Sequence, residues 1–247
     1  MATTRVQVCG PLVIERDGER LDGALPGRQG RLLFAYLVLN RRRPVTRDEL
    51  LAALWPDGSP AATDTALNAL LSKLRRALGA HAVDGRAGVR LRIDPAWIDV
   101  EAAFEAIHRA ESAIALESYD RAWGPSLVAL FAAERELLPG EDLDWIVDRR
   151  RHLHELQLRA LEAYARAGLG IGGTELAAAV RAARRLVALA PLRESGYCVL
   201  MRALAAQGNA AEALQVYSSL CEALRDELGA SPSPSTRDVY DQLLRIT

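Results

Sequence analysis

Residues 65–79 read TALNALLSKLRRALG, and this stretch decides the fold of the N-terminal part of the chain. Successive residues of an α-helix lie about 100 degrees apart, and on that spacing the leucines of the stretch fall within one arc of about 100 degrees. We therefore expect an amphipathic helix whose leucine face is buried, ended by Gly79 as a left-handed cap. The leucines of this face are Leu67, Leu70, Leu71, Leu74 and Leu78.

The face opposite these leucines carries hydroxyl, amide and cationic side chains. Asn can pair bidentately with adenine and Arg with guanine in a major groove, while the other side chains contact phosphates. A solvated helix face usually mixes acidic with basic residues, so the lack of acids over residues 65–78 favours a recognition helix over an ordinary solvated face. The members of the polar face are Thr65, Asn68, Ser72 and Arg76, with Lys73 and Arg75 on its flanks.

The residues before this helix predict a small sheet and two further helices. Residues 1–25 alternate in hydropathy around a turn at Arg16–Glu19, which is typical of an antiparallel sheet. Helical periodicity follows Pro26, and a second helix is expected to begin at Thr46, where Glu49 completes a capping box. We expect the third helix, which contains residues 65–79, to begin near Ser59.

A hairpin is predicted after the third helix, over residues 83–93. Asp84, Gly85 and Gly88 are turn residues between short β-prone pieces. Strands, three helices and a final wing hairpin together predict an α+β winged helix-turn-helix domain over residues 1–95.

From Asp99 to its end the chain is predicted to be helical. Asn209 and Glu212 have capping-box spacing, and paired helices with small residues at their contacts are typical of tetratricopeptide repeats. Gly168–Gly173 is interpreted as a linker, because it follows a helix and not the strand that a dinucleotide loop requires. The whole chain is thus predicted to be mainly α, with an all-α tetratricopeptide-like domain over residues 99–247. The expected helices cover residues 99–116, 118–137, 142–168, 174–189, 193–207, 209–228 and 233–246.

The formal charge differs between the two halves of the chain. Residues 1–95 hold 15 Lys and Arg against 10 Asp and Glu, a net +5, whereas residues 96–247 hold 16 against 22, a net −6. The basic half attracts phosphates and the acidic half repels them. The chain lacks an apolar run of about 18 residues and a signal core, so we expect a cytoplasmic, nucleoid-associated protein without membrane contact.

Further cations surround the predicted recognition helix. Arginines lie in the loop before the second helix, at the start of that helix and on the wing hairpin, where they are placed to contact backbone phosphates or a minor groove. The complete set of candidate DNA-binding residues is Arg41, Arg42, Arg43, Thr46, Arg47, Thr65, Asn68, Ser72, Lys73, Arg75, Arg76, Arg86 and Arg90.

The residues of an enzyme site are not recognisable. The sole lysine, Lys73, does not stand in a P-loop, and the cysteines lack the C-x-x-C spacing of a zinc or redox site. His152 and His154 diverge by about 200 degrees on a helix and do not converge on one metal ion. We therefore predict neither a catalytic residue, nor a metal, nor a cofactor.

Four motifs in the N-terminal part resemble the OmpR-type DNA-binding domain of Streptomyces antibiotic regulatory proteins. Segments in the C-terminal part resemble the bacterial transcriptional activation domain of the same family. The N-terminal motifs are residues 28–33 (RQGRLL), 44–50 (PVTRDEL), 54–57 (LWPD) and 71–79 (LSKLRRALG), and the C-terminal segments are 191–194 (PLRE), 200–204 (LMRAL), 211–217 (AEALQVY) and 224–229 (LRDELG) with Pro232-Ser233.

This resemblance implies an activator that binds direct repeats in promoter DNA as a head-to-tail dimer and recruits RNA polymerase with its sigma factor. It also implies control of a secondary-metabolism or other specialised gene cluster. The family's wing commonly ends in Gly-Tyr, whereas this chain has Gly88-Val89. No receiver or nucleotide-binding domain flanks the two modules, so control by phosphorylation or ATP is not expected.

Two other functions compete with this interpretation. The chain could be a protein-interaction scaffold in which the helical repeats bind partners and the winged domain does not bind DNA, because repeat surfaces often form concave peptide sites. An enzyme is the third alternative, and it would require a reproducible turnover, for which the sequence contains no recognisable catalytic residues.

Overall fold

The structure of the chain is a computed structural model that describes residues 4–56, 63–85 and 88–246. Its contacts divide into two compact units. The first comprises Met1–Glu101 and Arg135–His152, and the second comprises Ala102–Glu134 and Leu153–Thr247. These units differ from the contiguous division expected near residues 95–99, because residues 135–152 pack with the N-terminal part of the chain.

The first unit contains a four-stranded sheet of order β3-β2-β1-β7. Strands β1 (Thr4–Gln7), β2 (Val13–Arg16) and β3 (Glu19–Arg20) are antiparallel, with Val6 opposite Ile14. Both of these side chains are fully buried, as the alternating pattern predicts. Strand β7 (Ala96–Ile98) adds to β1 in parallel, a pairing that the sequence pattern did not predict.

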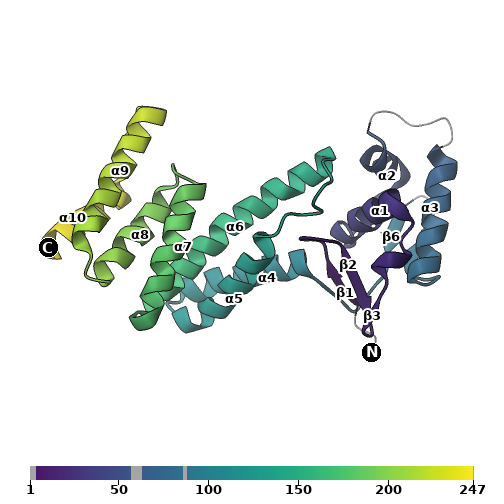
Figure 1. The fold of residues 1–247 in the computed structure, drawn as a ribbon, viewed down its shortest axis with the longest axis horizontal. Helices are drawn as coiled ribbons and strands as arrows, with labels where there is room; N and C mark the ends of the chain where they lie inside the picture. The colour runs from purple at the N-terminus through teal and green to yellow at the C-terminus, as the bar shows by residue number, and fades with distance from the viewer. Residues whose placement is uncertain (1–3, 57–62, 86–87, 247) are drawn as a thin grey trace. The chain divides into compact units, whose positions relative to one another are not determined.

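Three helices and a second sheet complete the winged helix-turn-helix (Figure 1). The helices are α1 (Gly27–Leu39), α2 (Arg47–Leu54) and α3 (Thr63–Leu78). Strands β5 (Val83–Asp84) and β6 (Gly88–Leu91) form the predicted hairpin, and β6 also pairs with β4 (Val45–Thr46). The predicted start of α3 near Ser59 lies outside the described residues.

Residues 135–152 belong to the first unit because they pair with its sheet and pack on its helices. Leu137 forms β-bridges with Cys9 and Gly10. The indole Nε1 of Trp145 donates to the carbonyl of Ala53 over 3.1 Å, and its ring meets the Tyr36 ring edge-on, with centroids 5.1 Å apart. Helical periodicity does not report such tertiary contacts. For that reason the sequence pattern assigned these residues to the helical domain.

The second unit is all helical, which confirms the predicted class (Figure 1). Helix α7 packs on α8, α8 packs on α9, and α10 packs on both α8 and α9. Alanine supplies much of the core, so the helices approach closely. The first residues of α4 and α6 belong to the other unit. The helices are α4 (Asp99–Ala115), α5 (Tyr119–Ala133), α6 (Asp144–Ile171), α7 (Leu176–Leu189), α8 (Glu194–Ala206), α9 (Ala210–Leu228) and α10 (Pro234–Ile246).

Two details of the helical unit correct the sequence expectations. Helix α6 continues through Gly168 and Gly170, so only the end of the predicted linker lies between helices. A Cβ atom at Gly170 would lie 2.2 Å from Cγ of Tyr119, which shows that the glycine permits the close approach of α5. The side chain of Asn209 makes no capping bond, and Glu212 pairs with Arg184 instead.

Within the described part of the chain, no helix combines the length and the apolar character that crossing a membrane requires.

Candidate DNA-binding surface

Helix α3 presents one buried and one exposed face. Leu67 and Leu74 are fully buried, Leu71 and Leu78 are nearly so, and Leu70 is half-buried at the edge of the core. Burial of these leucines stabilises the helix in one rotational setting, because an apolar side chain removed from water contributes about 1.5–3 kcal/mol. The residues of the predicted polar face that this setting leaves exposed are Thr65, Asn68, Ser72, Lys73 and Arg76.

Two arginines anchor the C-terminal end of α3. Arg16 Nη1 donates to the carbonyl of Leu78 over 2.7 Å, and Gly79 follows with a φ of +102 degrees. Arg75 Nε donates to the carbonyl of Val83 over 3.0 Å, which ties α3 to the wing strand β5. The half-buried Arg75, predicted to contact DNA, therefore has a structural bond on its guanidinium.

The start of α2 is fixed by the predicted capping box. Thr46 Oγ1 accepts from the Glu49 amide over 3.2 Å, and Glu49 Oε2 accepts from the Thr46 amide over 2.9 Å. Arg43 Nη1 also lies 2.9 Å from Glu49 Oε2. The Arg43 guanidinium and then the Thr46 amide hold the pKa of Glu49 below its ordinary value. Arg43 thus keeps a partly exposed charge that Glu49 partly neutralises.

Arg47, at the first turn of α2, reaches two side chains of α3. Its Nη2 lies 3.0 Å from Asp64 Oδ1 and 3.0 Å from Asn68 Oδ1. The Asp64 side chain is 75% exposed and stands one turn before Asn68, so the polar face of α3 does have an acid at its edge. The expectation of an acid-free face was wrong for the complete helix, because it considered only residues 65–78.

Arg41 is held inside the first unit rather than displayed on its surface. Its Nε and Nη2 donate to the two carboxylate oxygens of Glu101 over 2.8 and 2.7 Å, and Nη1 contacts Asp94. Only 15% of the Arg41 side chain is exposed. The pKa of Glu101 is lowered from its ordinary value, and the largest cause is the hydrogen bond from Arg41. The structure thus assigns Arg41 a structural role, whereas the side chain of the neighbouring Arg42 is 76% exposed and its Nη2 lies 3.7 Å from Glu101 Oε2.

The wing places its predicted cation on the strand face away from the core. Val89 and Leu91 of β6 are buried, and Arg90 between them points to the opposite face and is half-buried. Arg92 pairs with Asp84 across the hairpin over 3.0 Å. Arg86, also predicted to contact DNA, lies outside the described residues.

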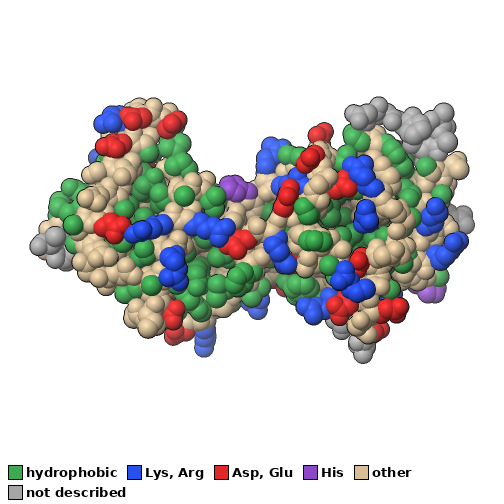
Figure 2. Space-filling view, viewed as in Figure 1, with side chains coloured by type: hydrophobic (Ala, Val, Ile, Leu, Met, Phe, Trp, Pro, Cys, Tyr) green, Lys and Arg blue, Asp and Glu red, His purple; other side chains and the backbone are tan. Residues whose placement is uncertain are grey.

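Four of the predicted cations form no ion pair among the residues that the structure describes: Lys73, Arg75, Arg76 and Arg90. Of these, Arg75 donates to the carbonyl of Val83. Lys73 and Arg76 therefore give the exposed face of α3 two cations that no carboxylate of the described residues neutralises. Figure 2 shows Lys and Arg side chains over α3. Such a face can hold phosphates electrostatically and present an amide to base edges.

Residues that could bind a metal do not gather in the described parts of the chain, where no three His, Cys, Asp or Glu side chains come together. His152 Nδ1 lies 2.8 Å from the carbonyl of Asp148, one turn earlier in α6.

A winged helix-turn-helix followed by stacked helices defines a two-module class of transcriptional regulator. The bacterial transcriptional activator domain matches residues 98–244, and the domain described as transcriptional regulatory protein, C terminal, matches residues 24–88. The chain therefore belongs to the Streptomyces antibiotic regulatory protein family, as its motifs predict.

Several transcriptional regulators are similar to the chain over both of its modules. The regulatory protein AfsR of Streptomyces coelicolor is 33% identical over 250 residues, and the chain spans 24% of its length. The transcriptional regulatory protein MoaR1 of Mycobacterium bovis is 30% identical over 265 residues, with 96% of this chain and 78% of MoaR1 covered. A solved structure of Mycobacterium tuberculosis EmbR, in complex with a low affinity phosphopeptide, matches with a TM-score of 0.87 at 25% identity, over 100% of this chain and 66% of EmbR.

Proposed function

We propose that the chain is a sequence-specific transcriptional activator that reads promoter DNA with the exposed face of α3. The observation that carries this proposal is the pairing of a buried leucine face with an exposed face that holds Asn68, Ser72, Lys73 and Arg76. In a winged helix-turn-helix, the recognition helix enters the major groove, where Asn and Arg distinguish base pairs.

The phosphate contacts in this proposal come from a reduced set of cations. Lys73, Arg76 and Arg90 keep charges available for phosphates, and Thr46 lies at the exposed start of α2. Arg42 contributes as an exposed cation whose Nη2 lies 3.7 Å from Glu101 Oε2. Arg43 and Arg47 contribute partly, since each is hydrogen-bonded within the protein. Arg41 is left out because Glu101 and Asp94 occupy its donors.

The family implies the remaining steps of activation. We propose that two copies bind direct repeats head to tail, and that the helical unit recruits RNA polymerase with its sigma factor at the promoters of a specialised gene cluster. The match of residues 98–244 to a transcriptional activator domain supports this part of the proposal.

Fluorescence anisotropy of the full chain tests DNA binding. The probes are duplexes from the DNA upstream of its own gene neighbourhood and shuffled duplexes of the same composition. We expect a preference for one native duplex of at least 1000-fold, and a log–log salt dependence with a slope of about −0.9 per neutralised phosphate. Equal affinity for native and shuffled duplexes would overturn sequence-specific binding and favour the interaction scaffold.

Transcription in vitro tests the activator step separately. Polymerase holoenzyme is supplied with the preferred duplex, with and without the full chain. We expect more transcript when the chain is present and its binding site intact, and unchanged transcript when the site is shuffled. A chain that binds the site yet leaves transcript unchanged or reduced would contradict recruitment.

A further inference from the structure

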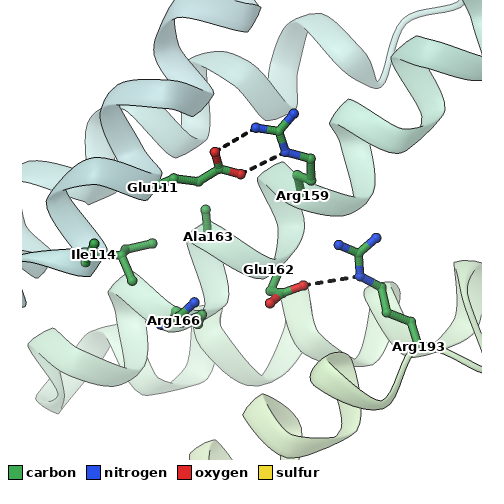
Figure 3. Close-up of a pocket in the computed structure, with 8 residues that line it drawn as sticks. Glu111, Ile114, Arg159, Glu162, Ala163, Arg166 and Arg193 are labelled. Atoms are coloured by element: carbon green, nitrogen blue, oxygen red, sulfur yellow. Dashed lines mark hydrogen bonds and ion pairs between the residues drawn. The ribbon is translucent and has the colours of Figure 1, made fainter.

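The helical unit contains a charged cavity that the proposed DNA contacts do not use. It lies between α4 and α6 beside the residue that precedes α8, and its volume is about 160 Å³ (Figure 3). Three arginines and two glutamates line it, and Ile114, Ala115 and Ala163 provide an apolar wall. The charged lining residues are Glu111, Arg159, Glu162, Arg166 and Arg193.

Two of the arginines are already neutralised by fixed carboxylates. Arg159 binds Glu111 in a bidentate pair, with Nε to Oε1 at 2.8 Å and Nη2 to Oε2 at 2.6 Å. Arg193 Nε lies 3.2 Å from Glu162 Oε2, and its Nη1 lies 2.9 Å from Oε1 of Glu155, which is not part of the lining. Figure 3 shows the Glu111–Arg159 pair above the Glu162–Arg193 pair, and the two pairs hold four charged groups of the lining in place.

The third arginine, Arg166, is left without a carboxylate. It follows Glu162 by four residues on α6, the spacing at which Glu and Arg normally pair on a helix. Glu162 Oε2, however, accepts from Arg193 Nε and from Ser195 Oγ over 2.8 Å. Among the residues that the structure describes, Arg166 forms no ion pair and no side-chain hydrogen bond, and its side chain is exposed.

Arg166 is therefore the one charged group of the lining that has no oppositely charged partner among the described residues. The lining holds three arginines and two glutamates, and Glu155 beside Arg193 supplies a third carboxylate. A monoanion would neutralise Arg166, whereas a dianion such as phosphate would leave a surplus negative charge close to Glu111 and Glu162. An arginine fork also matches the two oxygens of a carboxylate.

The size and the apolar wall define the rest of the ligand. A volume of about 160 Å³ accommodates several water molecules. That space admits a carboxylate on a stem of a few carbon atoms, which would lie against Ile114, Ala115 and Ala163.

We propose that this cavity, termed here the Arg166 pocket, binds a single carboxylate on a short apolar stem. Arg166 binds the carboxylate oxygens, and the two fixed ion pairs shape the opening. A free short-chain carboxylic acid and the acidic side chain of a peptide share this chemistry, and the experiment separates the two sources.

Isothermal titration of the full chain at low salt uses three probes: butyrate, inorganic phosphate, and an acetylated and amidated Ala-Ala-Glu-Ala-Ala peptide with its Gln counterpart. We expect butyrate or the Glu peptide to bind with a dissociation constant on the order of 1 mM, since few atoms make contact. Tenfold tighter binding of the Glu peptide than of butyrate identifies a peptide source, and equal or weaker binding of the peptide identifies a free acid.

Arg166→Gln removes the charge and keeps a polar stem, and Arg202→Gln is the matched control on the exposed surface of α8. We expect at least a tenfold loss of carboxylate affinity in the first variant and no change in the second, with equal melting temperatures. Equal losses in both variants, no carboxylate binding by the wild type, or phosphate binding more tightly than either carboxylate would overturn the proposal. Because the pocket lies outside the first unit, Arg166→Gln leaves affinity for DNA unchanged, so this result is separable from the test of DNA binding.

Discussion

Arg47 Nη2 donates to Asn68 Oδ1 over 3.0 Å, which joins the first residue of α2 to the exposed face of α3. A guanidinium only donates, so the amide oxygen of Asn68 must face Arg47 and its nitrogen must face away. Among the described residues, the oxygen keeps a second lone pair free and the nitrogen donates neither of its hydrogens. Asn68 is thus held in an orientation that can pair with N6 and N7 of adenine at the same time.

A double-mutant cycle tests whether Arg47 acts through Asn68. Asn68→Ala should reduce discrimination among base pairs by about 1–3 kcal/mol, because one bidentate contact is lost. Arg47→Ala should reduce it less, and the double variant should be no worse than Asn68→Ala. Anisotropy with matched and single-mismatch duplexes measures each value. Losses that simply add would show that the two residues act independently.

Neighbouring arginines on α3 should separate DNA binding from stability. Arg76 is exposed and has no described ion-pair partner, so Arg76→Ala should weaken binding to every duplex and reduce the magnitude of the salt slope by about 1. Arg75 donates to Val83, so Arg75→Ala should lower the free energy of unfolding by about 1 kcal/mol. Salt titrations of DNA binding and urea unfolding of both variants measure these two effects. A loss of stability in Arg76→Ala with weaker DNA binding in Arg75→Ala alone would contradict the assigned roles.

The Arg41–Glu101 pair should make the stability of the first unit depend on pH. Arg41 holds the pKa of Glu101 below its ordinary value of about 4.3, so the pair stabilises the folded state above that pH. The stabilisation is lost as the pH falls through the lower, folded-state pKa. Glu101→Gln should cost about 1–2 kcal/mol at pH 7, and its difference from the wild type should shrink below about pH 4.

Urea unfolding at pH 7 and at pH 3 measures this difference. Asp226→Asn is the control, since Asp226 is 65% exposed and its pair with Arg225 should contribute less than about 0.5 kcal/mol. A Glu101→Gln deficit that stays constant down to pH 3 would contradict the ion-pair explanation.

Two glycines inside helices should respond differently to alanine. A Cβ atom at Gly170 would lie 2.2 Å from the Tyr119 ring, so Gly170→Ala should destabilise the protein by about 1–3 kcal/mol. Gly124 is exposed and directly precedes Pro125 in α5. The proline ring crowds a Cβ atom on the residue before it and offsets the higher helix propensity of alanine, so Gly124→Ala should change the free energy of unfolding by less than about 0.5 kcal/mol. Thermal unfolding of the two variants measures both changes, and equal losses would contradict the packing of α5 on α6.

The sequence predicted the elements that depend on local periodicity and capping. The leucine face of α3, the box of Thr46 and Glu49 and the seven C-terminal helices follow from patterns within a few residues, and the structure confirms them. The parallel pairing of β7 with β1 and the packing of Trp145 on α1 and α2 join segments far apart in the chain, which periodicity does not report.

The candidate site was predicted less completely than the fold, for the same reason. Arg41 meets Glu101 60 residues later, and Arg47 meets Asn68 21 residues later, so neither partner was evident in the sequence. The position of Asp64, one turn before Asn68, could have shown that the polar face has an acid at its edge. The stretch interpreted as the polar face began at Thr65, one residue later. Partners contributed by the fold thus decide which arginines remain free for DNA.

Selection of preferred sites from a random duplex library tests most directly whether the exposed face of α3 reads base pairs. The full chain is compared with Asn68→Ala and with Gln215→Ala, which truncates an exposed amide on α9. We predict that Asn68→Ala loses its preference at one base pair of each half-site and keeps the others, while Gln215→Ala selects the wild-type site. An Asn68→Ala protein that selects the wild-type site with undiminished preference at every position would contradict the account.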